Sequence, residues 1–96
     1  MILGKIVGTV VSDVRNDGIA GARYLLVDKC NQHGEKKNDI IVALDLVGAG
    51  YDELVMIAEG SSARETEVTF NKPMNAIIVG IIDLIDEMGQ LVYKKS

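Results

Sequence analysis

The chain has few of the residues on which metal binding, covalent catalysis and base stacking depend. Its 96 residues include one cysteine, one histidine, one proline and no tryptophan. A single cysteine, Cys30, excludes a disulfide within the chain, which fits a reducing compartment. Cys30 and His33 lie three positions apart without a second pair of ligands, so the sequence predicts no metal site.

Basic and aromatic residues are also scarce. Ten Lys and Arg stand against fourteen Asp and Glu, which gives a net charge of −4. Proteins that bind single-stranded nucleic acid combine a basic groove with aromatic platforms. The aromatic share here is 4%, and Tyr24, Tyr51, Phe70 and Tyr93 do not cluster in the sequence. Nucleic acid is therefore not an expected partner.

Long apolar runs and a targeting segment are missing too. The longest apolar run, residues 76–82, is the size of a strand and far shorter than the ~18 residues of a membrane span. The first three residues are followed at once by Gly4 and Lys5, so no N-terminal signal is expected. The sequence predicts a cytoplasmic protein with no membrane partner.

Aliphatic residues are what the chain has in excess. Its hydrophobic share is 48%, almost all of it Ile, Val, Leu and Ala. A domain of this length buries only about 60–65% of its unfolded surface. The sequence thus carries more apolar surface than one small core can hide, which favours an obligate oligomer over an unusually apolar monomer.

Short β-branched and aliphatic runs predict an all-β fold. Strands are expected at residues 2–11, 23–28, 40–46, 54–58 and 76–82, with an edge strand at 91–93. The first should bend at Gly4 and Gly8, and residues 83–88 could extend the fifth. The polar stretch 30–39 is expected to be a loop, and a short helix should begin at Ala63. We expect one domain, a small OB-like closed β-barrel of five to six strands with one short helix, spanning about 1–83 with an extension at 84–96.

Two of the predicted strands support assembly. The strands at 40–46 and 76–82 are apolar on both faces, apart from Asp45. An antiparallel strand with one wet face should alternate between apolar and polar residues. The outer faces of these strands are therefore predicted to be covered by a partner.

Gly48-Ala49-Gly50 suggests a dinucleotide-binding loop, but the third glycine of that motif would fall at Glu53 and no long helix follows. A tight turn or a close backbone approach is the better interpretation. No cofactor site is predicted.

Residues 60–64, Gly-Ser-Ser-Ala-Arg, resemble a nucleophile elbow, but Arg64 occupies the last glycine position. His33, the only histidine, lies in a polar stretch, so no general base is predicted for a serine nucleophile. Ser62 is better interpreted as a helix N-cap, with Glu65 completing a capping box. Arg64 gains nothing from the helix dipole at this position. It is either an exposed arginine or an interface residue that binds a carboxylate across a subunit boundary. No catalytic residue is predicted.

Five segments, in order, resemble the EutN/CcmL family of bacterial microcompartment shell proteins. The resemblance covers residues 1–83, and its segments are 4–11 (GKIVGTVV), 21–27 (GARYLLV), 47–50 (VGAG), 60–64 (GSSAR) and 72–83 (KPMNAIIVGIID). Asp52 departs from the family pattern, which often has glycine there. If that position needs a positive φ, Asp tolerates it better than most residues.

The resemblance implies a structural protein without enzyme activity. It implies an OB-like barrel that forms a ring, usually a pentamer, at the fivefold vertices of a cytoplasmic microcompartment shell. Its partners would be its own copies and the hexameric shell proteins. By analogy, Gly48, Ala49, Gly50, Ser61 and Ser62 are the candidates for lining a central opening. Fold class alone leaves one alternative, a standalone OB-fold module that binds single-stranded nucleic acid or another ligand.

Overall fold

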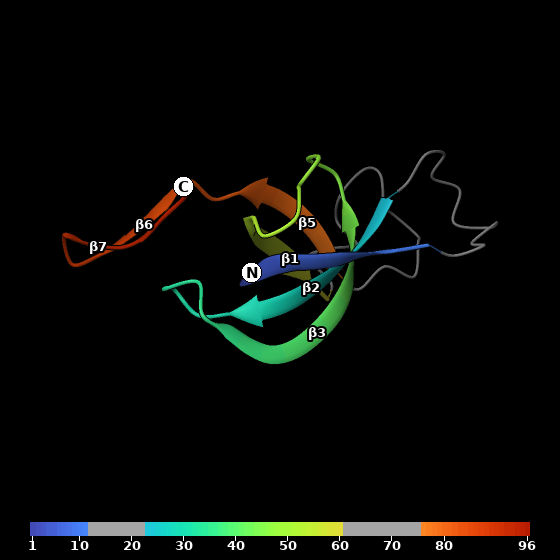
Figure 1. Ribbon diagram of the computed structural model, residues 1–96, viewed down its shortest axis with the longest axis horizontal. Coiled ribbons are helices and arrows are strands. Elements are labelled where there is room, and N and C mark those ends of the chain that lie inside the picture. The colour runs from blue at the N-terminus through green and yellow to red at the C-terminus, as the bar shows by residue number, and fades with distance from the viewer. Residues whose placement is uncertain (12–22, 61–75) are drawn as a thin grey trace.

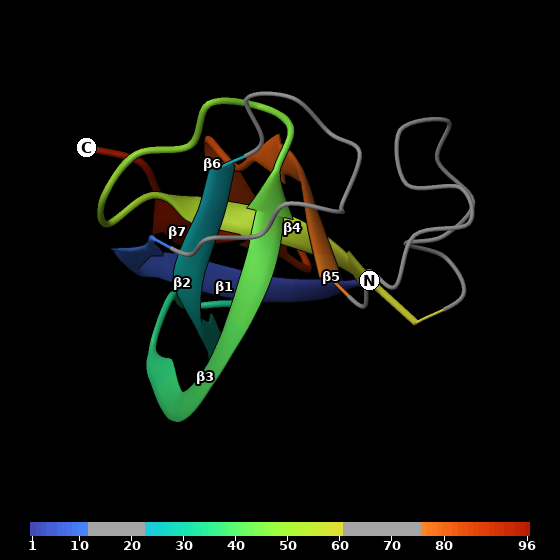
Figure 2. The ribbon, with the colours of Figure 1, turned by 90° about the vertical axis from the view of Figure 1, so that its right-hand side faces the viewer.

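Five strands close into a barrel, and two more form a separate hairpin. A computed structural model describes residues 1–11, 23–60 and 76–96. The barrel has the strand order β1-β2-β3-β5-β4 (Figures 1 and 2), with bounds β1 Ile2–Val10, β2 Arg23–Cys30, β3 Lys36–Asp45, β4 Leu54–Glu59 and β5 Ala76–Ile81. The second sheet pairs β6 Leu84–Glu87 with β7 Gln90–Lys94. The predicted all-β closed barrel is confirmed, while the helix expected at Ala63 lies outside the described residues.

Four of the five barrel contacts are antiparallel, and β3 pairs with β5 in parallel. This parallel contact closes the cylinder, where Leu44 lies opposite Ile77. A closed barrel leaves none of its five strands as an open edge. The wall is therefore complete, and its outward side chains form the surface available to partners.

The core follows from alternation along the strands. Alternate residues of a strand point to opposite faces, so one set from each strand meets inside the barrel. The buried cluster contains Ile6, Leu25, Val27, Ala43, Ala49, Val55, Ile57, Ala76 and Ile78. A smaller buried pair, Leu44 and Ile77, packs with Tyr24 and Val79. Among the described residues, aliphatic side chains make up the larger cluster, and Tyr24 packs against the smaller pair.

The glycines of β1 act differently from each other. A Cβ on Gly4 would lie 2.4 Å from Val27 Cγ1, so only glycine lets β1 approach the core so closely. The pairing register of β1 with β2 shifts between Ile6 and Gly8. That bulge bends the strand at Gly8, one of the two expected positions, while Gly4 pairs regularly with Lys29.

The structure corrects the expected loop at 30–39. Strand β2 runs to Cys30 and β3 begins at Lys36, so only residues 31–35 form the turn. The Asn31 side chain accepts hydrogen bonds from the backbone N–H groups of His33 (2.9 Å) and Glu35 (3.0 Å). These local bonds tighten the turn, and the polar residues after it continue the ladder as an exposed strand. Polarity there marked exposure rather than the absence of a strand.

Residues 84–94 form a hairpin that we call the arm. It extends the chain beyond the barrel (Figure 1) and is a new strand pair rather than a continuation of β5. Its turn holds Gly89 at φ +82°, as the expected turn requires. The predicted edge strand at 91–93 is β7. One face of the arm packs on its own chain, because a Cβ on Gly34 would lie 3.0 Å from the Tyr93 ring, and Gln32 donates to Glu87 at 3.1 Å.

Candidate assembly site

The loop at residues 46–53 is folded around one carboxylate. Asp45 ends β3 with its side chain 1% exposed. Its Oδ1 accepts hydrogen bonds from the backbone N–H groups of Val47 and Gly48, both at 3.0 Å, and its Oδ2 accepts one from Ala49 at 3.1 Å. An aspartate directly before a turn often binds the following amides in this way. The glycine-rich turn therefore has a built-in support.

Arg23 contacts both the Asp45 carboxylate and the backbone of the loop. Its Nη1 lies 3.7 Å from Asp45 Oδ2, and its Nη2 donates to the carbonyl of Ala49 at 3.3 Å. The Ala49 methyl group is buried in the barrel core. Gly48, at φ +75°, is exposed, and a Cβ placed on it would meet nothing within 4 Å. The loop is thus anchored by Ala49 and presents Gly48 to its surroundings.

The second half of the loop is tied to β1 and to the end of the chain. Ile6 exchanges backbone hydrogen bonds with the loop: its N–H donates to the Glu53 carbonyl (3.1 Å), and its carbonyl accepts from Asp52 N–H (2.9 Å). Asp52 has φ +66°, so this position does need a positive φ, the condition under which aspartate is better tolerated than most residues. Lys5 lies 3.6 Å from the Asp52 carboxylate.

A carboxylate and a lysine connect this loop to the base of the arm. Glu53 accepts a hydrogen bond from Gly50 N–H, and its other oxygen lies 2.7 Å from Lys95 Nζ. The Lys95 hydrogen bond, with that of Gly50, lowers the pKa of Glu53, and the same contact raises the pKa of Lys95. Each group stabilises the charged form of the other. Because Lys95 N–H also donates to the Asp83 carbonyl at 2.8 Å, the pair links the loop to both ends of the arm.

The predicted opening residues divide into two groups. Gly48, Ala49 and Gly50 lie together in this loop, while Ser61, Ser62 and Arg64 lie outside the described residues. Their assignment to an opening or an interface stays a prediction.

Sequence reasoning did not find the supports Asp45, Arg23, Glu53 and Lys95. The available signal was Asp45 three positions before Gly48, an arrangement in which a carboxylate commonly binds turn amides. Glu53 lies in the loop itself, three positions after Gly50, whereas Arg23 and Lys95 are far from the loop in sequence and carry no local signal.

The first apolar surface, the β3 face, consists of Leu26, Ile40 and Val42. Val42 lies opposite Leu26, next to the inward pair Val27 and Ile41. The two pairs therefore point to opposite sides of the wall. Ile40 is 45% and Val42 49% exposed. The doubly apolar third strand predicted from sequence thus has an uncovered outer side.

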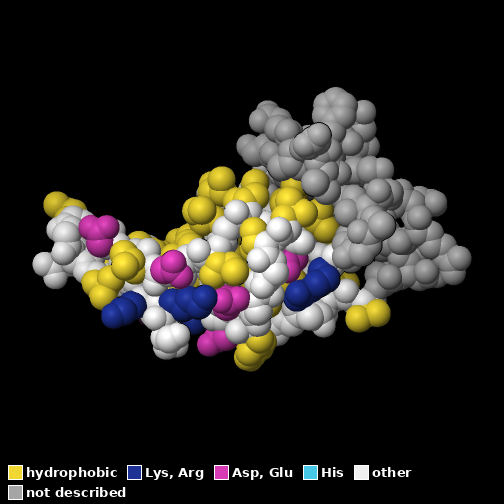
Figure 3. Space-filling view, turned by 90° about the horizontal axis from the view of Figure 1, so that it is seen from above, with side chains coloured by type: hydrophobic (Ala, Val, Ile, Leu, Met, Phe, Trp, Pro, Cys, Tyr) yellow, Lys and Arg dark blue, Asp and Glu magenta, His cyan; other side chains and the backbone are white. Residues whose placement is uncertain are grey.

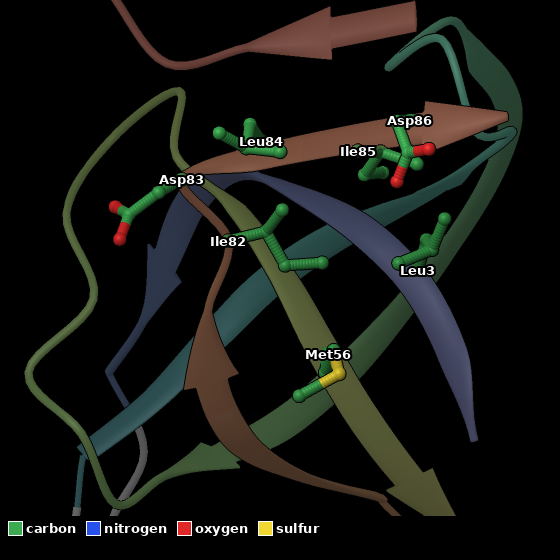
Figure 4. Close-up of a pocket in the computed structure, with 7 residues that line it drawn as sticks. All are labelled: Leu3, Met56, Ile82, Asp83, Leu84, Ile85 and Asp86. Carbon is green, nitrogen blue, oxygen red and sulfur yellow. The ribbon is translucent and has the colours of Figure 1, made fainter. Parts of the chain in front are cut away.

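The second apolar surface is a groove where the arm leaves the barrel. We call it the arm groove; its volume is about 720 Å³ and its lining is Leu3, Met56, Ile82, Asp83, Leu84, Ile85 and Asp86. Figure 4 shows Leu84 to Asp86 along β6, Met56 on β4 and Leu3 on β1, with the Asp83 carboxylate directed away from these side chains. Leu84 is 57% exposed. The groove has an apolar floor and acidic residues along the arm.

The two apolar surfaces lie on different sides of the barrel. The β3 face is on β2 and β3, whereas the barrel strands that line the arm groove are β1, with Leu3, and β4, with Met56. In the closed order, β4 neighbours β5 and β1 but neither β2 nor β3. A space-filling view also shows hydrophobic side chains spread over both arm and barrel, between charged ones (Figure 3).

The described residues show few features of a metal site, a reactive thiol or a membrane-spanning helix. Within residues 1–11, 23–60 and 76–96, no three His, Cys, Asp or Glu residues gather as a metal site would require. Burial raises the pKa of the Cys30 thiol, which disfavours the reactive thiolate. His33 is exposed in the turn, as expected. No helix in the same described part is long and apolar enough to cross a membrane.

Comparison with known proteins gives consistent matches over the chain. A sequence model described as "Ethanolamine utilisation protein EutN/carboxysome" matches residues 1–83. The carboxysome shell vertex protein CcmL of Synechocystis is 38% identical, with 99% of this chain and 95% of that protein covered. EutN of Escherichia coli, a bacterial microcompartment shell vertex protein, is 33% identical over 99% of this chain and all of that protein.

The solved structures agree in shape. The structure of E. coli EutN superposes with a TM-score of 0.84, with all of both chains covered. The GrpN pentameric microcompartment shell protein of Rhodospirillum rubrum is 35% identical with a TM-score of 0.80, covering 92% of this chain and all of that one. The sequence model covers residues 1–83, and these relatives are more than 30% identical over nearly the whole chain. Their solved structures superpose on this chain over nearly its full length. The chain belongs to the EutN/CcmL family.

Proposed function

We propose that this chain is a structural subunit of a bacterial microcompartment shell, and that five copies form a ring at a vertex. The observation that carries the proposal is membership of a family whose relatives are named shell vertex proteins, one of them with a pentameric structure. The chain's role in this proposal is mechanical, and no enzyme activity is assigned to it.

The surface of the single chain supports a ring. A head-to-tail ring needs two different surfaces on each subunit, since the same contact is repeated around the axis. The β3 face and the arm groove are two such surfaces, and they differ in shape and charge. A two-fold dimer would need only one self-complementary patch.

The ring is tested by the mass of the untagged protein in native mass spectrometry. A dominant pentamer that survives dilution supports the proposal, and a stable monomer contradicts it. The alternative, an OB-fold binding module, would be favoured by a monomer that binds an oligonucleotide more weakly as salt rises.

We propose that the 46–53 loop faces the ring axis, with Gly48 at the rim of the opening together with Ser61 and Ser62. Gly48 is exposed on a loop that Asp45 and Arg23 hold in place. A cysteine at an axial position lies close to its copies, so Gly48→Cys should cross-link neighbouring subunits under mild oxidation. Met88→Cys, at the arm tip, is the matched exposed control. Equal cross-linking of both variants would contradict the axial placement.

We propose hexameric shell proteins as the outer neighbours of this ring, in the cytoplasm of the cell that builds the shell. Vertices of a polyhedral shell need pentagons where its facets are tiled by hexagons. Deleting the gene should therefore leave shells that fail to close, visible by electron microscopy as elongated or open bodies, and re-expression should restore closed shells. Closed shells in the deletion strain would contradict this role.

A further inference from the structure

The inference concerns which two surfaces meet in the ring, and it rests on the proposed function. We infer that the arm groove of one subunit receives the β3 strand of the next copy, with the β3 face on the groove floor. The occupant is thus residues 36–42 of a second copy of this chain. Three observations support this choice.

First, the arm has one covered and one uncovered face. Ile85 lies opposite Tyr93, and Tyr93 packs on the chain's own turn at Gly34. Leu84 and Leu91 lie on the other face and are 57% and 58% exposed. An isolated two-stranded hairpin is marginally stable in water. An arm that displays leucines on its free face is expected to gain its remaining support from outside the chain.

Second, the charges of the two surfaces are opposite. The groove is edged by Asp83 and Asp86, both exposed. The β3 strand begins with Lys36 and Lys37, also exposed, and the one carboxylate of the same segment, Asp39, is paired with Lys29 at 3.7 Å. Complementary charges fix the register of a contact and exclude wrong pairings more than they add affinity.

Third, β3 is long enough to make both contacts at once. Ile40 is four positions from Lys36 within this strand, a separation of about 13 Å at about 3.3 Å per residue. Seating Ile40 and Val42 over Met56 and Ile82 would therefore leave the lysines in reach of the acidic residues of the arm.

The pairing is tested by placing one cysteine on each surface. Val42→Cys and Leu84→Cys are made singly and together, and each protein is treated with a short bismaleimide. Cys30 is buried, and any cross-linking through it is measured by treating the unmodified chain with the same reagent. In the double variant we expect a ladder of covalent dimers up to pentamers in denaturing gels. The single variants should stay largely monomeric there, because each would lack the partner thiol.

Native mass spectrometry of the same samples separates this inference from the proposed function. If the unmodified chain is not a pentamer, the proposed function fails. If it is a pentamer and the double variant remains pentameric without a covalent ladder, the pairing is overturned while the ring stands. A ladder in the Val42→Cys variant alone would also overturn it, because it would place two β3 faces against each other.

Discussion

Two glycines of β1 differ in the space around them, and this gives a test at the scale of one methyl group. A Cβ on Gly4 would lie 2.4 Å from Val27 Cγ1, whereas a Cβ on Gly8 would meet Leu26 at an ordinary 3.6 Å. Gly4→Ala should therefore cost about 1–3 kcal/mol of unfolding free energy by overpacking. Gly8→Ala should change it by less than about 0.5 kcal/mol. Chemical denaturation of both variants measures the difference, and equal losses would show that β1 does not approach the core as described.

Asp45 is expected to hold the 46–53 loop. Asp45→Ala leaves three backbone N–H groups without their acceptor, so it should lower the unfolding free energy by about 2 kcal/mol. Hydrogen exchange should quicken at residues 47–49 in particular. Asp45→Asn keeps an acceptor oxygen and should lose less. Unchanged exchange in the alanine variant would mean that the loop does not depend on this carboxylate.

The Glu53–Lys95 pair predicts a pH dependence. Because the pKa of Glu53 is lowered from 4.5, its stabilisation is present above pH 4.5 and is lost as pH falls through the lowered value. Because the pKa of Lys95 is raised from 10.5, its stabilisation is fully present below pH 10.5 and is lost as pH rises through the raised value. Glu53→Gln should therefore flatten the acid side of the stability profile, and Lys95→Met should do the same. Thermal unfolding from pH 3 to 7 measures this, and a variant profile as steep as that of the unmodified chain would contradict it.

At the scale of elements, the sequence predicted what local pattern controls. The five barrel strands followed from aliphatic runs between turn residues, and Gly89 marked the arm turn. The start of β3 did not follow, because its first residues are polar; Lys36 pairs with Cys30, and the Asp39 N–H donates to the Asp28 side chain at 2.9 Å. The loop supports were also missed, since Glu53 and Lys95 come together only through the path of the arm. Long-range contacts of this kind carry no periodic signal.

The arm gives a prediction at the same scale. Leu84→Asp places a charge in the arm groove, while Met88→Asp makes the same change at the tip, where the side chain is 99% exposed. If the groove receives a second copy, Leu84→Asp should raise the apparent dissociation constant of the ring at least tenfold. Met88→Asp should leave it unchanged. Sedimentation across a dilution series measures both. A ring equally stable in the two variants would remove the groove from the interface.

For the whole molecule, the proposed ring accounts for the surplus of aliphatic residues. The barrel buries its inner set, yet Ile40, Val42, Met56, Leu84 and Leu91 remain exposed on a chain of 96 residues. Exposed apolar surface on this scale marks an interaction site or an aggregation hazard. A closed ring covers it and leaves no open end for further copies to join.

The proposed pentameric ring is tested most directly by native mass spectrometry of the untagged chain, diluted from tens of micromolar to below one micromolar. We expect five times the 10.4 kDa subunit mass to dominate throughout the series. A hexamer would keep the ring and contradict the vertex role. A monomer at every concentration would contradict the account as a whole, because the β3 face and the arm groove would then have no partner among copies of this chain.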